Sequence, residues 1–552
     1  MTVLITPREY RITVEPDLDR FLFAGRMTLA AHAHAPVDSV TLDCAELAVW
    51  QCRFQASEKE TSSGDCRFTQ DPANAKLTVH LPVSVAGPFH LAVEYAGRIN
   101  DRMAGFYRSA IRTADGPGFI AVTQFQENDA RRAFPCFDHP AQKAVFTVEM
   151  VIAPDLTAVS NTVIQTVADL GDGRQRVTFT PTPRMSTYLL FFGVGPFEIH
   201  EDPVDRRLRA VCLPGAGGQT AFGREFGRKA LAYGENYFAI AYPLPKLDLI
   251  AVPDFAFGAI ENWGAITFRE NLLLNVAGVT SREALVRICE VIAHEIAHQW
   301  FGNLVTPEDW KYLWLNESFA TYFGYGMVDH HYPVWEIWHQ FIRSQTETAL
   351  TRDALKETFA IEMPGGAQVA ITTSTAPIIY SKGGSILRQL ESWIGPEAFK
   401  AGLRRYLTDF AYGSAASHNL WESLADASGM PVAETMRSWV TQPGFPLVTA
   451  VRRGGTLRLR QERFTYLSND ADQVWLVPVA VTCHLGDAAQ QTVRFLLDRQ
   501  AADIDLPAGT RAYKLNADQT GFYHVRYDDA DNLAMLREMV EHRRLAAADR
   551  WG

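Results

Sequence analysis

The pattern of polar and apolar residues changes twice along the 552-residue chain, and these changes restrict its fold more than any other feature. Over the first ~200 residues the two kinds alternate, as at 11–15, 26–30 and 145–149, which predicts β-strands. From Gln219 the spacing becomes helical, and strands return at 446–527. The sequence therefore predicts a large β-domain, a helix-rich centre and a small β-sandwich.

The composition indicates a globular chain that does not bind polyanions. Apolar residues make up 47% and charged residues 21% of the chain, which excludes a disordered or fibrous protein. The net charge of -11 argues against nucleic acid as a partner. The longest apolar stretches are far shorter than the ~18 residues of a membrane span, so we expect no membrane association.

The cysteines and the first residues predict a cytoplasmic protein. The seven cysteines are scattered, odd in number and without CxxC pairing, a pattern typical of reduced thiols in a chain of this size. The N-terminus has no basic start followed by an apolar core, so we expect no secretory signal.

A long apolar helix is predicted at residues 281–300. Thr280 and Glu283 form the pattern of an N-terminal capping box, and Gly302 is a stop signal. Within this helix lies the motif His294-Glu295-Ile-Ala-His298.

The spacing of the two histidines predicts a zinc site. Residues four apart lie on one face of a helix, one turn from each other, so both imidazoles can reach a single Zn²⁺. Glu295 follows His294 directly, where its carboxylate can hold the attacking water. The motif therefore predicts one catalytic Zn²⁺ per chain, bound by His294 and His298 and two further ligands.

The third protein ligand has to come from another segment. One zinc peptidase class places Gly and His shortly after the second histidine, but this chain has Phe301 and Leu304 there. Glu317 lies in a run of apolar residues, where a carboxylate is costly unless it is paired or metal-bound. Two histidines and Glu317 would leave one zinc position open for water, as catalysis requires.

With Glu317 eighteen intervening residues after His298, the sequence resembles the gluzincin aminopeptidases, which include aminopeptidase N and puromycin-sensitive aminopeptidase. The Gly-Ala-Ile-Glu-Asn run is similar to the family's GAMEN motif, with Ile260 in place of Met. Residues 123–140 resemble the segment that precedes this motif, although His139 stands where Glu is commoner. Residues 379–383 and 439–446 match the catalytic-tyrosine segment and the end of the catalytic domain.

The resemblance implies a multidomain α+β fold. The implied domains are an N-terminal β-sheet domain at 1–203, a thermolysin-like α/β zinc catalytic domain at 204–445, a small β-sandwich at 446–527 and the start of a truncated C-terminal helical domain at 528–552. Relatives continue into a large helical domain over the active site, so we expect a more open cleft here.

The resemblance also implies a zinc aminopeptidase that removes the N-terminal residue from peptides with a free N-terminus. Glu295 would be the general base and acid, and Tyr380 would stabilise the oxyanion. An ammonium group in a partly dry cleft needs a fixed carboxylate, and Glu261 is the candidate. The implied substrate-binding residues are Gln126, Gly258, Ala259, Ile260, Glu261 and Asn262.

Three other functions remain open. An endopeptidase would not need the amine-binding residues Glu261 and Gln126. Epoxide hydrolase activity occurs in one relative that shares the zinc core. An inactive or weakly active fragment would keep the fold, but Glu295 and the expected zinc ligands are all present.

Overall fold

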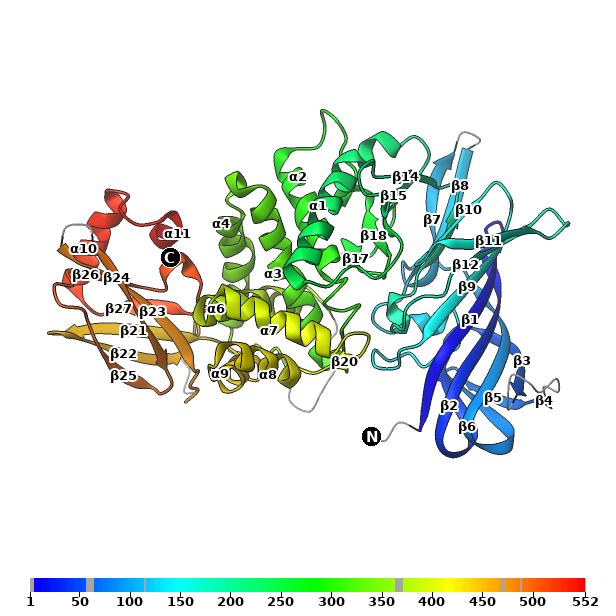
Figure 1. Ribbon diagram of the computed structural model, residues 1–552, viewed down its shortest axis with the longest axis horizontal. Coiled ribbons are helices and arrows are strands. Elements are labelled where there is room, and N and C mark those ends of the chain that lie inside the picture. Colours follow the sequence, from blue (N-terminus) through cyan, green and yellow to red (C-terminus); the bar gives the residue numbers. More distant parts are fainter. Residues whose placement is uncertain are drawn as a thin grey trace. The chain divides into compact units, whose positions relative to one another are not determined.

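The computed structural model describes residues 4–55, 64–113, 116–362, 371–467, 472–486 and 489–551 (Figure 1). Met1, where the predicted first domain begins, and Gly552, where the predicted last domain ends, lie outside the described residues. A β-rich N-terminal region is followed by regions with both helices and sheets, so the predicted α+β fold is confirmed. The chain forms two compact units, residues 1–309 with 410–414 and residues 310–409 with 415–552.

The first unit begins with a large sheet of order β11-β12-β9-β1-β2-β6-β3-β4, in which β5 also pairs with β6. Its strands are β1 (Ile5–Asp17), β2 (Leu22–Asp43), β3 (Ala48–Gln55), β4 (Gly64–Asp65), β5 (Arg67–Asp71), β6 (Lys76–Arg98), β9 (Val145–Ile152), β11 (Ile164–Asp169) and β12 (Gln175–Phe179). Tyr10, Ile12 and Val14 of β1 are fully buried, as the alternating pattern predicts.

Two further sheets share a core in this unit. One has the order β10-β13-β8-β7 and the other β14-β15-β16-β18-β17. Their strands are β7 (Gly105–Thr113), β8 (Gly116–Gln124), β10 (Thr157–Ser160), β13 (Phe192–Gly195), β14 (Glu198–Glu201), β15 (Leu208–Cys212), β16 (Leu247–Val252), β17 (Ala259–Ile260) and β18 (Ala265–Arg269). Tyr107 of β7 packs in one cluster with Val211 of β15 and Ile250 of β16, so apolar burial joins the sheets.

Helix α2 (Arg282–Ala297) begins at a different cap from the one the sequence suggests. Ser281 is the N-cap, and its Oγ accepts a hydrogen bond of 3.2 Å from the backbone N–H of Ala284. The Thr280 hydroxyl instead accepts a hydrogen bond within the preceding turn. Beyond the helix, Gly302 has a φ of +123°, as expected of a residue that stops a helix.

Other regular elements are α1 (Ala221–Phe238), which precedes α2, and the short strands β19 (Thr306–Pro307) and β20 (Ser414–Ala415), which pair with each other.

The second unit contains a helical region whose first long helix is buried on nearly every side. This helix, α3, carries Glu317 in its first turn. The helices are α3 (Trp314–His331), α4 (Ile337–Phe341), α5 (Glu347–Asp353), α6 (Gly383–Ile394), α7 (Pro396–Asp409), α8 (Ser417–Ser428) and α9 (Val432–Val440). A π-helical segment, η9 (Pro377–Lys382), leads directly into α6.

Two small sheets follow in the same unit, with orders β25-β22-β21-β27 and β24-β23-β26. Their strands are β21 (Pro446–Arg453), β22 (Thr456–Arg463), β23 (Val477–His484), β24 (Gln490–Leu497), β25 (Ala501–Asp505), β26 (Ala512–Leu515) and β27 (His524–Tyr527). The helical region is tied to them by a hydrogen bond of 2.8 Å from the backbone N–H of Phe522 to Gln389 Oε1.

The last helices are α10 (Ala530–Glu541), which packs on these sheets, and α11 (Ala547–Trp551), whose Asp549 lies 3.7 Å from Lys514 Nζ of β26. Leu536 and Met539 of α10 are buried in a cluster with Ala512 of β26. Leu533 and Val540 of the same helix are exposed, so only part of its apolar face is covered within the described chain.

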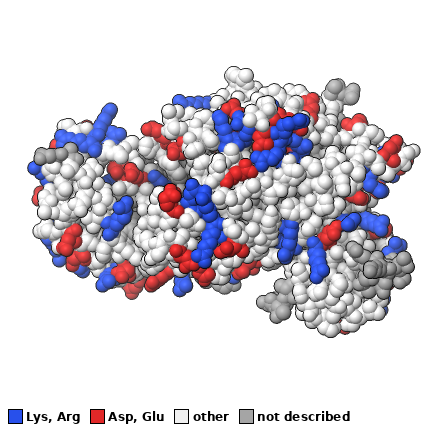
Figure 2. Space-filling view, in the orientation of Figure 1, with Lys and Arg blue, Asp and Glu red and all other residues white. Residues whose placement is uncertain are grey.

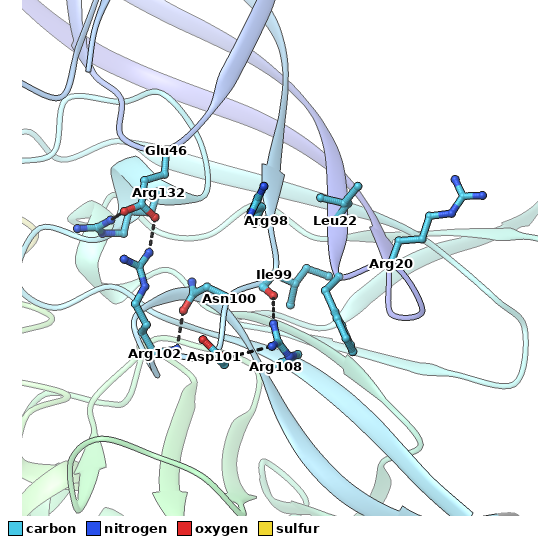
Figure 3. Close-up of a pocket in the computed structure, with 11 residues that line it drawn as sticks. Arg20, Leu22, Glu46, Arg98, Ile99, Asn100, Asp101, Arg102, Arg108 and Arg132 are labelled. Carbon is cyan, nitrogen blue, oxygen red and sulfur yellow. Dashed lines mark hydrogen bonds and ion pairs between the residues drawn. The ribbon is translucent and has the colours of Figure 1, made fainter. Parts of the chain in front are cut away.

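Arginines line a cavity of about 750 Å³ in the first unit (Figure 3). Glu46 accepts hydrogen bonds from both Arg102 and Arg132, and Asp101 accepts one from Arg108 at 2.9 Å. These three arginines of the cavity wall are therefore held in ion pairs. On the face drawn in Figure 2, basic and acidic side chains lie interspersed.

Candidate active site and metal centre

Helix α2 presents the two histidines of the HExxH motif as its spacing predicts. The ring centroids of His294 and His298 are 4.8 Å apart. His298 is 1% exposed, and its Nδ1 lies 3.0 Å from the backbone oxygen of Phe301. A carbonyl can only accept, so Nδ1 carries the proton and Nε2 keeps the lone pair that a metal would take. This arrangement fits a zinc ligand, because metal-binding histidines usually donate their other N–H to such an acceptor.

The structure brings Glu261 of the Gly-Ala-Ile-Glu-Asn segment (258–262) to the HExxH helix, α2. Glu261, Glu295 and His298 each offer one ligand atom, and these atoms all lie within 4.8 Å of one another. Glu261 is 2% exposed and Glu295 is 5% exposed. Two buried carboxylates beside an imidazole are costly unless cations are bound there, so this cluster is suited to hold a metal ion and an ammonium group.

Backbone pairing fixes the segment that carries Glu261. Strand β17 pairs antiparallel with β18, and Gly258 accepts a hydrogen bond of 3.0 Å from the backbone N–H of Arg269. The guanidinium Nε of Arg269 also donates to the backbone oxygen of Phe255 at 2.9 Å. After the segment, Gly264 has a φ of +80°, and a Cβ there would lie 2.3 Å from the backbone oxygen of Asn161. Only glycine fits this turn, which returns the chain to β18.

A second contact links the same segment to the loop after the zinc helix. Asn303 is buried, and its Nδ2 donates a hydrogen bond of 2.8 Å to the backbone oxygen of Glu261. Asn303 therefore holds the Glu261 backbone from the α2 side. Asn303 is not among the site residues predicted from the sequence, and its position directly after the stop glycine was the available signal.

Two amide side chains expected to bind substrate have buried atoms that a ligand could satisfy. Within the part of the chain that the structure describes, Gln126 Nε2 and Asn262 Oδ1 are buried without a hydrogen-bond partner. Asn262 Nδ2 donates to Thr267 Oγ1 at 3.3 Å, which fixes the orientation of its amide. Native proteins seldom leave buried polar atoms unpaired, so these two atoms mark places where a polar ligand would fit.

A buried carboxylate orders the segment that follows Gln126. Asp138 accepts hydrogen bonds from Arg131 Nε at 2.9 Å and from Thr187 Oγ1 at 2.8 Å. Burial raises the pKa of Asp138, and the Arg131 guanidinium opposes this shift. His139, which stands where Glu is commoner in relatives, has its Nε2 4.0 Å from a carboxylate oxygen of Asp309.

In the second unit, Glu317 and Tyr380 lie on segments that contact each other directly. Glu317 is 2% exposed. The next residue, Ser318, donates a hydrogen bond of 2.7 Å from Oγ to the backbone oxygen of Ile379, which precedes Tyr380. A Cβ on Gly383 would lie 1.8 Å from Ser318 Oγ, so only glycine allows α6 to approach α3 this closely.

A buried ion pair fixes the other side of the Tyr380 segment. Lys382 and Asp353 are both fully buried, and their charged atoms are 2.9 Å apart. Lys382 Nζ also donates to the backbone oxygen of Gly444 at 3.1 Å, while Asp353 Oδ1 accepts from the backbone N–H of Gly444 at 3.0 Å. The Tyr-Ser-Lys-Gly-Gly motif at 380–384 and the Gln-Pro-Gly-Phe-Pro motif at 442–446 are therefore joined. Both motifs are identified from the sequence, but the prediction did not include their pairing. A lysine in an apolar segment, such as Lys382, was the available signal, because a buried charge needs a partner.

Among the described residues, no helix combines the length and the apolar character needed to cross a membrane. All seven cysteines are free thiols.

Comparison with known proteins gives two family matches. A model described as "Peptidase M1 N-terminal domain" matches residues 6–189, and one described as "Peptidase family M1 domain" matches residues 222–439. Together they cover most of the chain and contain every candidate site residue.

Individual relatives match along nearly the same length. The chain is 37% identical to "Aminopeptidase M1-A" of Oryza sativa subsp. japonica over 99% of this chain and 63% of that protein. It is 39% identical to "Probable aminopeptidase 2" of Sulfurisphaera tokodaii over 84% of this chain and 57% of that protein. It is 37% identical to "Tricorn protease-interacting factor F2" of Thermoplasma acidophilum over 99% of this chain and 65% of that protein.

The chain spans less than two thirds of the length of each of these relatives. The family matches nevertheless agree with the motifs, the fold and the arrangement of Glu261, Glu295 and His298. The resemblance to the gluzincin aminopeptidases is confirmed, and the chain belongs to peptidase family M1.

Proposed function

We propose that this chain is a zinc-dependent aminopeptidase that removes the N-terminal residue from peptides with a free N-terminus. The observation that carries the proposal is the group of ligand atoms from Glu261, Glu295 and His298 within 4.8 Å of one another. An aminopeptidase has to bind a free amine directly beside the reacting carbonyl. A buried carboxylate next to the HExxH helix meets this requirement, and an endopeptidase would have no use for it.

The proposed metal ligands are His294, His298 and Glu317, with one Zn²⁺ per chain. Two imidazoles and one carboxylate are the donor set of many catalytic zinc sites, and they leave one position open. The hydrogen bond from His298 Nδ1 to Phe301 supports the proposal, because it directs Nε2 to a metal. When bound, zinc polarises the scissile carbonyl and lowers the pKa of a water molecule toward ~7.

Glu295 is the proposed general base and then the general acid. Its carboxylate takes a proton from the attacking water and passes it to the departing nitrogen, so one residue serves both halves of the hydrolysis. Tyr380 donates a hydrogen bond from its phenol to the oxyanion that forms at the carbonyl. One well-placed donor of this kind contributes roughly 3 to 4 kcal/mol to transition-state stabilisation.

Glu261 and Gln126 are the proposed ligands of the substrate's α-ammonium group. The buried Glu261 carboxylate supplies the charge, and the amide of Gln126 supplies a neutral polar contact. Gly258, Ala259, Ile260 and Asn262 form the backbone edge along which the peptide would lie. Small residues at the start of this edge allow the two backbones to approach closely.

The domain boundaries and the location of the protein also stand as proposals. We propose domain boundaries at 1–203, 204–445, 446–527 and 528–552, as the resemblance implies. A cytoplasmic location is supported by the seven free thiols, because a reducing compartment keeps such residues unpaired.

The proposal is tested by metal content and hydrolysis measured on the same preparation. The full chain should contain one zinc in the proposed site and should hydrolyse an amino-acid arylamide. A strong chelator should abolish this activity, and added Zn²⁺ should restore it. The matched control is the same arylamide with an acetylated amine, which should be cut poorly.

Each alternative function predicts a different result. Equal hydrolysis of the free and the acetylated substrate would favour an endopeptidase, and opening of an epoxide without amide hydrolysis would favour an epoxide hydrolase. A zinc-loaded, folded chain without any activity would contradict the proposal and favour an inactive fragment.

A further inference from the structure

Three potential metal ligands gather on the β14–β15 hairpin, away from the HExxH motif in the sequence. Glu198 of β14 lies directly opposite Cys212 of β15 in the antiparallel register. His200 is two residues after Glu198, so its side chain lies on the same face of the sheet. The hairpin therefore presents a carboxylate, an imidazole and a thiol side by side. Figure 1 shows β14 and β15 at one end of their sheet, close to α1.

The distances within this cluster suit a single ion. One ligand atom from each of Glu198, His200 and Cys212 lies within 4.8 Å of the other two. His200 Nε2 and Glu198 Oε2 are 3.2 Å apart. Nitrogen and oxygen ligands on one tetrahedral zinc are separated by roughly 3.4 Å, given bond lengths of about 2.1 Å. The imidazole and carboxylate therefore already have the spacing of two ligands of one metal. The thiol would need to move by about 1.2 Å at most, because the ligand atoms lie within 4.8 Å of one another and a sulfur ligand lies roughly 3.6 Å from its neighbours.

The surroundings restrict the imidazole and shield the thiol. A Cβ on Gly217 would lie 2.2 Å from His200 Nε2, so the Gly217 backbone already lies against this ring. Cys212 is fully buried, while Glu198 and His200 are partly exposed. An ion can therefore enter from the solvent side, and the sulfur would close the site from within. One divalent cation would neutralise a carboxylate and a thiolate, which removes the cost of burying their charges.

We propose that Glu198, His200 and Cys212 form a second metal site, which binds Zn²⁺ or a similar transition-metal ion with one position left to water. The mixed oxygen, nitrogen and sulfur donors favour a borderline metal such as Zn²⁺ or Co²⁺ over Mg²⁺ or Ca²⁺. The ion would join the edge strand β14 to β15, so it should stabilise the folded chain as well as bind to it.

Cobalt distinguishes this site from the proposed catalytic one. The catalytic set of His294, His298 and Glu317 has no sulfur, whereas Cys212 would bind Co²⁺ through a thiolate. Titration of the metal-free full chain with CoCl₂ should therefore produce a near-ultraviolet sulfur-to-cobalt charge-transfer band. With ZnCl₂, the chain should bind one equivalent more than the catalytic site accounts for.

The variants Cys212→Ser and His200→Ala should each lose the charge-transfer band and the additional zinc equivalent. Both should keep metal-dependent arylamide hydrolysis, because neither residue belongs to the proposed catalytic site. The matched control is Cys483→Ser, which removes a buried thiol from the second unit and should keep the band. If Cys212→Ser does not fold, His200→Ala still tests the proposal, because this side chain is partly exposed.

A parent chain that binds Co²⁺ without a charge-transfer band would overturn the proposal. Persistence of the band in Cys212→Ser would do the same, because the sulfur would then come from another cysteine. Zinc stoichiometry that is equal in the parent and in both variants would leave a simple His200–Glu198 hydrogen bond as the role of the cluster.

Discussion

Ser318 Oγ donates a hydrogen bond of 2.7 Å to the backbone oxygen of Ile379. Ser318 follows Glu317 on α3, and Ile379 precedes Tyr380 in η9. This one buried hydrogen bond therefore fixes the spacing between α3, which carries the proposed zinc ligand Glu317, and η9, which carries the proposed oxyanion donor Tyr380. Catalytic groups tolerate little displacement, so residues that hold this contact should affect turnover without touching substrate.

Gly383→Ala should lower both stability and kcat. The new Cβ would lie 1.8 Å from Ser318 Oγ, so either α6 moves away from α3 or Ser318 rotates and loses its bond to Ile379. Overpacking of this kind costs roughly 1 to 3 kcal/mol. The control is Gly326→Ala on α3, where a Cβ would meet only Trp338 at 3.9 Å. Thermal unfolding and arylamide kinetics on both variants check this, and equal behaviour of the two would contradict it.

Glu295→Gln should retain zinc and lose nearly all turnover. Glutamine keeps the size of the side chain but cannot take a proton from water, so the chemical step loses its base. Elemental analysis and arylamide hydrolysis on the same sample measure both effects. Substantial activity in this variant would assign the base to another residue.

Tyr380→Phe should lower kcat by roughly 10²-fold or more with a modest change in KM. The lost hydrogen bond is expected to act on the oxyanion, which exists only along the reaction path. Steady-state kinetics with one arylamide separate the two constants. A kcat equal to that of the parent would remove Tyr380 from the mechanism.

Glu261→Gln should raise KM as well as lower kcat, because the ammonium group is bound in the ground state and in the transition state. A hydrogen bond to a charged group contributes about 1.5 to 3 kcal/mol, so kcat/KM should fall by roughly 10- to 150-fold. The variant should also discriminate less between free and acetylated substrates. Unchanged discrimination would show that another group recognises the amine.

Lys143→Met should stabilise the chain, and the gain should shrink as the pH rises. Lys143 is buried, and its Nζ has no hydrogen-bond partner among the residues that the structure describes. Burial lowers the pKa of Lys143 to about 7, and Arg184 adds to this shift. Between pH about 7 and about 10.5 the unfolded chain therefore holds one proton more than the folded chain. The free energy of unfolding of the parent should consequently rise with pH in this window.

The thermal unfolding midpoints of the parent and of Lys143→Met, measured at about pH 7 and about pH 9, test this linkage. The gap between the two proteins should be larger at the lower pH. A gap that does not change with pH would show that Lys143 is not buried in its neutral form.

Much of the secondary structure could be predicted because its signals are local. Alternation at residues 11–15 and 145–149 corresponds to β1 and β9, and the run at 281–300 corresponds to α2. The predicted N-cap of α2 is wrong by one residue, because Thr280 and Ser281 both have side chains suited to cap a helix. Only the surrounding turn selects between them, since it engages the Thr280 hydroxyl.

The sequence alone determined the spacing of His294 and His298, because a helix converts a four-residue interval into a shared face whatever surrounds it. The approach of Glu261 to Glu295 and His298 depends on tertiary structure, since it requires β17 to pair with β18 and Asn303 to hold the Glu261 backbone. The same is true of Glu198 and Cys212, which meet only through the register of β14 and β15. Contacts between distant segments are set by how apolar faces pack and how strands align, and no local pattern contains that information.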